Sequence, residues 1–373
     1  MPKKIGILTA GSDCPGLNAA IRAVGKAARN TYGMEIIGFQ DGFKGLIDDQ
    51  VVLIEGQALS GILTTGGTIL GTSRDKLNAK PEKDGIVDQV AAAATTYHKH
   101  QLDGLVCIGG IETQESAFQL MKQGLNILSI PKSIDNEIPM TDTAIGFDTA
   151  ISIATEAIDR LHSTAHSHHR IILVEIMGHE AGWLTLGAGL AGGADVIAIP
   201  EIPYDVLKIA DAVLQRNKVG KRYSIVAVAE GALAKETVTF FEHSRKINDS
   251  IRSGAEKEKV SQTLEKIENR LSGNAIPLAY RLEKFTGLDT RITILGHLVR
   301  GGAPSAADRN LATQLGTTCA RLAYEGHYGV MLAIQNGSLQ VVPLEQIVGE
   351  RKLVPLDHPW IESARLVGTC LGD

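Results

Sequence analysis

The sequence predicts an α/β protein built on mainly parallel sheets, and three observations support that fold class. Short apolar runs alternate with longer segments of helical period along nearly the whole chain. Glycine is abundant, with 40 residues among 373, and such usage is typical of many tight turns between strands and helices. Aromatic residues make up only 4%. Strands interleaved with helices indicate parallel sheets that are flanked by helices.

The apolar runs are expected to form buried strands, because each is short and bounded by turn-forming residues. In order along the chain they are Ile5–Leu8, Met34–Phe39, Gly104–Ile108, Leu125–Ile130, Ile171–Met177, Val196–Ile199, Ser224–Ala229, Ile292–Leu295 and Val330–Ile334.

The segments between these runs are expected to form helices, since each has helical period and follows a turn-forming cluster. They are Gly16–Asn30, Val87–Tyr97, Thr113–Gln123, Thr149–Ser163, Asp205–Asn217 and Asn310–Tyr324. One more segment, His243–Gly273, is rich in charged residues and keeps only a thin apolar stripe. We expect a single solvent-exposed helix there, with ion pairs between residues four apart.

Length and charge limit the possible organisation and partners. A chain of 373 residues with 44% hydrophobic composition is long enough for two domains with separate cores. The formal net charge of −5 and a pI near 6.1 provide no basic surface field, so a nucleic-acid partner is not expected. An anionic ligand would have to be held locally, by arginines and backbone amides.

The cysteines and the start of the chain bear on its location. Cys14, Cys107, Cys319 and Cys370 are scattered without C-x-x-C spacing, so neither a zinc site nor a disulfide framework is indicated. The chain has no apolar run of about 18 residues, and it enters its first strand without a signal-peptide pattern. We therefore expect a cytoplasmic protein without a membrane partner.

The segment Pro131–Glu137 carries the clearest chemical pattern. Its sequence is Pro-Lys-Ser-Ile-Asp-Asn-Glu, and it follows an apolar run directly. Asp135 lies three residues after Lys132 and two after Ser133. A carboxylate just past a buried strand, beside a cation and a hydroxyl, is suited to accept a proton from an alcohol while an anion is bound nearby. The pattern indicates a kinase-like transferase.

The first strand-to-helix turn predicts an anion site. Gly11 and Ser12 are small enough for the backbone to approach a ligand, and the following helix begins with unpaired amides. The turn matches neither G-x-G-x-x-G nor G-x-x-x-x-G-K-[ST], so neither a dinucleotide fingerprint nor a P-loop is indicated. Taken alone, such a turn can also be a plain connection.

Several motifs occurring in order resemble the 6-phosphofructokinase family. They are the first turn with the strand before it, Gly71–Arg74, Ser167–Arg170, Met177–Gly178 and Leu295–Gly302. The resemblance runs from about Lys4 to Leu344. It implies an enzyme that moves a phosphoryl group from ATP or pyrophosphate to the 1-hydroxyl of fructose 6-phosphate, with Mg²⁺ as cofactor.

The same resemblance implies two Rossmann-like, three-layer α/β/α domains in a homotetramer. Residues 1–146 with about 299–350 would form the donor-binding domain. Residues from about 147 to 298, with 351–373, would form the sugar-phosphate-binding domain. The sugar site would be shared between subunits.

Site residues are carried over from the family by position. The implied catalytic residues are Asp135 as the base, Arg74 as the cation that steadies the transferring phosphoryl group, and Lys132. The donor would be bound by Gly11, Ser12, Gly109, Gly110, Glu112 and Thr113. The sugar phosphate would be bound by Ser133, Glu137, Arg170, Met177, Gly178, Glu230, Arg291, His297 and Arg300. Of these, Arg170 and Arg291 would reach the sugar phosphate of a neighbouring subunit.

The donor side departs from the family pattern. Ile111 stands where the family has an aspartate that supports Mg²⁺, and an aliphatic side chain cannot do so. Glu112 stands where the ATP-using branch has glycine and the pyrophosphate-using branch has aspartate. Ser12 replaces a glycine, and His179 replaces an arginine. Glu112 and Lys132 favour pyrophosphate, although some ATP-using relatives carry the lysine too, so the donor stays open.

Two functional hypotheses follow from these departures. In the first, the chain is an active phosphofructokinase in which Glu112 supports Mg²⁺. In the second, it is a weak or silent paralogue that binds sugar phosphate and regulates a partner. If Ile111 has simply replaced the metal-supporting acid, Ile111→Asp should raise the rate.

A histidine-rich region invites a metal interpretation, but no carboxylate or cysteine stands at ligand spacing beside it. It comprises His162, His166, His168, His169 and His179. The resemblance instead places His162 near the region where bacterial relatives bind phosphorylated effectors, together with the basic residues Arg22, Lys26 and Lys221.

Overall fold

The computed structural model describes residues 2–77, 79–82, 85–251, 254–270 and 275–373. The chain forms two compact units. Unit 1 comprises Met1–Ala150 and Arg300–Lys352, and unit 2 comprises Ile151–Val299 and Leu353–Asp373. Each unit has its own sheet and its own core.

Unit 1 is built on a seven-stranded sheet in the order β13-β12-β7-β6-β1-β2-β3. The strands are β1 (Lys4–Ala10), β2 (Glu35–Phe39), β3 (Val51–Leu53), β6 (Gly104–Gly109), β7 (Ile127–Pro131), β12 (Val330–Gln335) and β13 (Ser338–Pro343). The inner strands run parallel, while β3 and β13 at the two edges run antiparallel to their neighbours.

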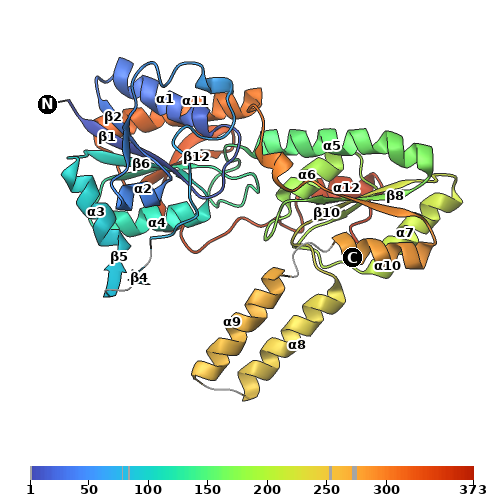
Figure 1. The fold of residues 1–373 in the computed structure, drawn as a ribbon. Helices are drawn as coiled ribbons and strands as arrows, with labels where there is room; N and C mark the ends of the chain where they lie inside the picture. Colours follow the sequence, from blue (N-terminus) through green and yellow to red (C-terminus); the bar gives the residue numbers. More distant parts are fainter. Residues whose placement is uncertain (1, 78, 83–84, 252–253, 271–274) are drawn as a thin grey trace. The chain divides into compact units, whose positions relative to one another are not determined.

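Helices cover both faces of this sheet (Figure 1), with α1 and α11 along one face and α3 and α4 along the other. The helices of unit 1 are α1 (Leu17–Asn30), α2 (Phe43–Ile47), α3 (Gln89–Lys99), α4 (Ile111–Lys122) and α11 (Ala306–Glu325). Short 3₁₀ turns lie at η1 (Ile62–Thr64) and η3 (Leu344–Gln346), and β4 (Ala79–Glu82) pairs with β5 (Gly85–Asp88) in a separate hairpin.

Unit 2 is built on a four-stranded sheet in the order β11-β8-β10-β9, with all strands parallel. The strands are β8 (Ile171–Ile176), β9 (Val196–Ala198), β10 (Ser224–Ala229) and β11 (Thr290–Ile294). Helices α5 and α6 lie on one face and α7 and α10 on the other (Figure 1). The remaining elements are α5 (Phe147–His168), α6 (Trp183–Ala191), α7 (Val206–Lys218), α10 (Ala275–Thr286), η2 (Gly296–Arg300) and α12 (Pro359–Leu366).

The predicted fold class is confirmed, and each predicted strand and helix overlaps an observed one. The sequence analysis missed α6 because nearly all of this helix is buried, so its apolar residues show no period. It also missed two edge strands: β3, which has only three residues, and β13, in which polar and apolar residues are mixed.

The expectation of one helix over His243–Gly273 was wrong. The chain forms two helices, α8 (Lys235–Ile251) and α9 (Ala255–Arg270), which lie side by side (Figure 1). Asn248 Nδ2 of α8 donates to the Lys257 carbonyl at 3.1 Å, and Asp249 pairs with Lys257 at 2.9 Å. Charges expected to pair along one helix therefore pair between two. Residues 252–253 and 271–273 of that segment lie outside the described residues.

Within the described part of the chain, no helix combines the length and apolar character that crossing a bilayer requires.

Candidate active site

The carboxyl ends of three neighbouring strands form one edge in unit 1. Ala10 of β1 is paired with Gly109 of β6, and Gly109 is paired with Pro131 of β7. The turns that follow these strands are consequently neighbours, and each carries residues that the sequence analysis selected. In open parallel sheets this edge is where ligands bind.

The turn after β1 is tied to the Gly71–Arg74 segment by the backbone. Gly11 has φ +81°, a conformation that favours glycine, and its amide donates to the Ser73 carbonyl at 2.8 Å. The Thr72 hydroxyl donates to the Gly11 carbonyl at 2.6 Å. These two bonds place Arg74, which is exposed, directly beside the first turn.

A pocket lies between the first turn, the Gly71–Arg74 segment and the start of α4. It is lined by Ala10, Gly11, Phe43, Ser73, Arg74, Asp75, Lys76, Glu112 and Thr113. The helix α4 has Gly110 at its N-cap and no side chain capping it, so its first amides suit an anionic group. The pocket thus gathers Gly11, Arg74, Glu112 and Thr113 as the sequence analysis expected.

Glu112 is one of two acids on this pocket, the other being Asp75, and it is paired with a lysine that the sequence analysis missed. Glu112 Oε1 lies 2.8 Å from Lys76 Nζ, and the Glu112 side chain is 53% exposed. The hydrogen bond that Lys76 donates to Glu112 raises the pKa of Lys76, which keeps that side chain positively charged. Lys76 lies two residues after Arg74 in the sequence, and this spacing could have indicated that it lines the same pocket.

Ile111 does not line this pocket. Its side chain is 7% exposed and belongs to the core cluster of unit 1, with Leu8, Leu105 and Leu120. The pocket is lined by Glu112 and Thr113 instead. We therefore no longer expect Ile111→Asp to raise the rate, because the new carboxylate would be buried among apolar side chains.

Two cations of unit 1 are fixed to the backbone of the first turn. Lys132, which is 4% exposed, donates from Nζ to the Ser12 carbonyl, and Arg300 donates to the Asp13 carbonyl at 3.2 Å. Burial lowers the pKa of Lys132, and the nearby charge of Arg300 acts in the same direction. A Cβ at Gly11 would lie 3.4 Å from Lys132 Nζ, so the lysine closes directly over this glycine.

The segment after β7, residues 132–142, is called here the Asp135 loop. Within it, the Asp135 amide donates to Ser133 Oγ at 3.1 Å, which fixes the turn between them. Asn136 has φ +51° and crosses the loop: its Nδ2 donates to the Asp142 carbonyl at 3.0 Å, and its Oδ1 accepts from the Ala144 amide at 3.1 Å. The sequence analysis missed this bridging role of Asn136.

Glu137, the next residue of the Asp135 loop, forms an ion pair with Arg351. The sequence analysis assigned Glu137 to the sugar site and gave Arg351 no role. Arg351 lies more than 200 residues later, so only the tertiary structure reveals the pair.

In unit 2 some predicted residues meet at the carboxyl edge of the sheet. The Glu230 amide donates to the Ile176 carbonyl at 2.8 Å, and the Gly231 amide donates to the Gly178 carbonyl at 3.1 Å. Met177, Gly178 and Glu230 are therefore neighbours, and His297 follows β11 in the exposed turn η2. His179 is exposed beside them.

Arg170 and Arg291 lie at the opposite end of the same sheet. Arg170 precedes β8, Arg291 is at the start of β11, and both pair with Asp289, the Arg291 contact being 2.5 Å. The seven steps from Arg170 to Met177 span roughly 23 Å at about 3.3 Å per residue. Unit 2 thus does not bring its arginine pair to its other candidates. The sequence analysis missed Asp289, although its position two residues before Arg291 could have indicated an ion pair.

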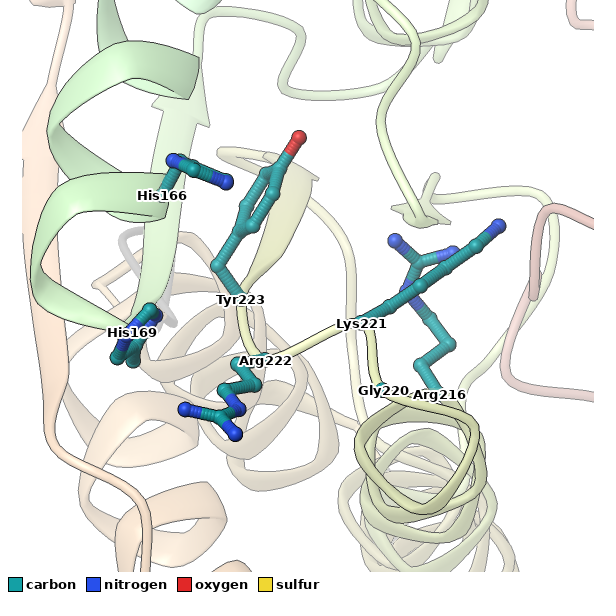
Figure 2. A pocket seen from close by; sticks show the side chains of 7 residues that line it. All are labelled: His166, His169, Arg216, Gly220, Lys221, Arg222 and Tyr223. Carbon is teal, nitrogen blue, oxygen red and sulfur yellow. The ribbon is translucent and has the colours of Figure 1, made fainter.

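A second pocket, of about 450 Å³, lies within unit 2. It is lined by His166, His169, Arg216, Gly220, Lys221, Arg222 and Tyr223. Figure 2 shows Arg216 and Lys221 on one side, with the two histidines and Tyr223 on the other. Such a lining suits an anion. His162 is close by, with its Nε2 2.7 Å from the Gly192 carbonyl oxygen, whereas Arg22 and Lys26 belong to α1 of unit 1.

Metal and thiol chemistry have few candidates. Among the residues that the structure describes, no three His, Cys, Asp or Glu side chains are grouped to hold a metal ion. All four cysteines are free, and burial raises the pKa of Cys14 to about 12. A thiol with so high a pKa is a poor nucleophile at neutral pH.

Comparisons with known proteins lead to one family. A family model described as Phosphofructokinase matches residues 4–323. The ATP-dependent 6-phosphofructokinase of Propionibacterium freudenreichii subsp. shermanii is 49% identical over 373 residues, which cover 100% of both chains. The enzyme of the same name from Spirochaeta thermophila is also 49% identical, over 100% of this chain and 98% of its own.

Solved structures lead to the same family. The phosphofructokinase of Saccharomyces cerevisiae superposes with a TM-score of 0.74 at 28% identity, covering 92% of this chain and 45% of that one. A pyrophosphate-dependent phosphofructokinase from Marinobacter aquaeolei, at 18% identity, shares the fold with a TM-score of 0.77 over 100% of this chain and 92% of its own. From the family match and the full-length relatives, the chain belongs to the phosphofructokinase family.

Proposed function

We propose that this chain transfers the terminal phosphoryl group of ATP to the 1-hydroxyl of fructose 6-phosphate. The observation that carries the proposal is the contact of the Asp135 loop with the first turn, where buried Lys132 donates to the Ser12 carbonyl. A base for the sugar hydroxyl and a cationic pocket for donor phosphates are thereby joined in one unit. This reaction would give the protein a place in glycolysis, and a cytoplasmic location stays a prediction.

The choice of ATP rests on the relatives. Both 49% identical proteins, matched over essentially their whole length, are named ATP-dependent. Glu112, which had favoured pyrophosphate, forms an ion pair with Lys76. The relatives' names also disfavour the silent-paralogue hypothesis.

In the proposed reaction, Asp135 accepts the proton of the 1-hydroxyl as its oxygen attacks phosphorus. Arg74 and Lys132 offset the negative charge that spreads over the transferring phosphoryl oxygens. The donor phosphates are proposed to bind Gly11, Ser12, Gly109, Gly110 and Thr113, at two helix N-termini that lack side-chain caps.

Magnesium fits this pocket only as an ion that donor phosphates carry with them. Mg²⁺ usually keeps several waters and takes one or two protein carboxylates beside substrate phosphates, so one acid is enough. The pocket is lined by two acids, Asp75 and Glu112, and we assign Glu112 to that role. When bound, Mg²⁺ would neutralise developing charge on the phosphate oxygens.

The sugar phosphate is proposed to bind the residues that the family resemblance implied. Ser133 and Glu137 of the Asp135 loop, with Met177, Gly178 and Glu230, would contact the sugar. Its phosphate would be held by His297 and Arg300 of one subunit and by Arg170 and Arg291 of another. The distance along β8 supports this sharing, because one small ligand cannot reach both ends of the strand. We propose a homotetramer on the same basis.

A coupled assay tests the proposal. Turnover of fructose 6-phosphate with Mg²⁺ would be measured separately with ATP and with pyrophosphate, and Asp135→Asn serves as the matched control. We expect turnover with ATP and at most a small rate with pyrophosphate. ATP turnover no faster than in the Asp135→Asn variant would overturn the proposed function.

A further inference from the structure

Two consecutive residues at the end of unit 1 make four contacts with the Asp135 loop. Lys352 Nζ donates to the Thr141 carbonyl at 2.7 Å and to the Asp142 carbonyl at 3.0 Å. The Lys352 amide donates to the Glu137 carbonyl at 2.8 Å, and Arg351 pairs with the Glu137 carboxylate. From these contacts we propose that Arg351 and Lys352 are positioning residues for phosphoryl transfer, which hold the loop that carries Asp135.

The contacts lead to Asp135 through a single residue. The Asp142 carbonyl accepts from Lys352 Nζ and also from Asn136 Nδ2, each at 3.0 Å. Asn136 follows Asp135 directly in the chain. Lys352 and Asn136 therefore share one acceptor, and a shift of that carbonyl would move the backbone on which the Asp135 carboxylate is mounted.

The loop needs such support because its backbone is strained. Asn136 and Met140 have φ values of +51° and +60°, which cost roughly 1–2 kcal/mol for residues other than glycine. One side of the loop is fixed to β12, where the Asp142 amide donates to the Ile334 carbonyl at 2.7 Å. Arg351 and Lys352 fix it again from another part of the chain, and a strained conformation persists when its surroundings over-determine it.

The Lys352 ammonium group is more buried than that of a typical surface lysine. Burial lowers its pKa to about 8, although the facing Asp142 carboxylate acts in the opposite direction. The ammonium thus gives up hydration for the two loop carbonyls. The inference rests on the proposed function, since positioning affects catalysis only if Asp135 is the base.

The first test compares Lys352→Met with Lys352→Arg, which can still donate to both carbonyls. Small displacements of a catalytic group lower rates strongly. We expect Lys352→Met to lower kcat about tenfold with an unchanged KM for ATP, and Lys352→Arg to recover to within about threefold of wild type. Lys99→Met is the control, because Lys99 also forms an ion pair in unit 1 but contacts Asp49, away from the loop.

A double-mutant cycle separates positioning from a general structural effect. If Lys352 acts through Asp135, adding Lys352→Met to Asp135→Asn should change the residual rate by less than about twofold. An equal tenfold loss in both backgrounds would overturn the proposal, and so would an unchanged kcat in Lys352→Met. If Lys352→Met does not fold, Arg351→Gln replaces it in the cycle, with the same two overturning outcomes.

Amide hydrogen exchange supplies a readout that does not depend on activity. Lys352→Met should speed exchange in residues 133–142 about tenfold, while the β6 strand keeps its wild-type rate. An unchanged exchange rate in the loop would overturn the inference that Lys352 holds the loop, even if the enzyme is active. Faster loop exchange in a protein without ATP turnover would instead reject the proposed function and leave the structural support in place.

Discussion

The two units place their functional residues in different ways. In unit 1, the candidates lie at one edge of one sheet and are joined by direct contacts from Lys132 to Ser12 and from Gly11 to Ser73. In unit 2, the candidates are divided between the two ends of β8, with Met177 and Glu230 at one end and the Arg170–Asp289–Arg291 group at the other.

This difference teaches which half of the reaction one chain can supply. The proposed donor pocket and the proposed base both lie within unit 1, because parallel strands bring their following turns together. Arg170 precedes β8 and Arg291 is the second residue of β11, so the pair lies at the opposite end of the sheet from the residues that follow these strands. We therefore propose that a ligand bound at one end takes the other group from a second copy of the chain.

The largest loss of activity is expected on replacing Asp135, the proposed base in unit 1. Asp135→Asn removes the proton acceptor but keeps the shape of the side chain. We expect kcat to fall about 10³-fold, or about 4 kcal/mol, with the KM for ATP nearly unchanged. Steady-state kinetics checks this. A loss below about tenfold would mean that another group accepts the proton.

The arginine pair tests the divided arrangement of unit 2. Arg170→Ser should raise the KM for fructose 6-phosphate about 100-fold, because a bidentate phosphate contact is lost, and Arg170→Lys should recover only part of it. Sharing between subunits makes a second prediction: refolding Arg170→Ser together with inactive Asp135→Asn should restore activity in mixed oligomers. No recovery on mixing would contradict a shared site.

Ile111→Asp tests which side chain at the start of α4 faces the donor pocket. Because Ile111 is buried in the core of unit 1, the aspartate should lower the free energy of unfolding by about 2–4 kcal/mol without raising the rate. Ile111→Val, which stays apolar, should cost about 0.5–1.5 kcal/mol. Denaturant unfolding followed by an activity assay decides this, and a faster, fully stable Ile111→Asp enzyme would show that position 111 faces the donor.

Glu112→Gln tests whether the Glu112 carboxylate supports Mg²⁺ in the pocket. Loss of the carboxylate charge should raise the Mg²⁺ concentration for half-maximal activity about tenfold, while the KM for fructose 6-phosphate stays unchanged. Lys76→Met is the matched variant, since it breaks the same ion pair but keeps the acid. If both variants shift the Mg²⁺ requirement equally, the ion pair and not the carboxylate is responsible.

The smallest effect concerns pH and the support of the Asp135 loop. Burial lowers the pKa of Lys352 from its ordinary value of 10.5 to about 8 in the folded state. Between these values the unfolded state binds more protons, so the contribution of Lys352 to stability rises with pH and is lost as pH falls through about 8. The Tm difference between wild type and Lys352→Met should shift in favour of wild type from pH 8 to pH 10. A constant difference would mean that Lys352 titrates normally.

Local sequence patterns predicted most of the fold and the identity of the central residues. The apolar runs identified the parallel strands because buried strands need apolar side chains on both faces. The position of Asp135 just after such a run, with Lys132 and Ser133 before it, indicated its chemistry without any contact being known. The charged segment at His243–Gly273 showed the limit of this reasoning, since composition indicated exposure but not that the chain folds back on itself.

The tertiary structure decided which of those residues act together. Glu112 rather than Ile111 lines the donor pocket because the start of α4 turns one side chain to the core and the next to the pocket. Asp289 joins two arginines, and Arg351 and Lys352 reach the Asp135 loop from more than 200 residues away. Sequence alone determines what each side chain can do and which strand precedes it. Only folding decides which distant charges and carbonyls meet, because those contacts depend on the paths of several strands and not on any local pattern.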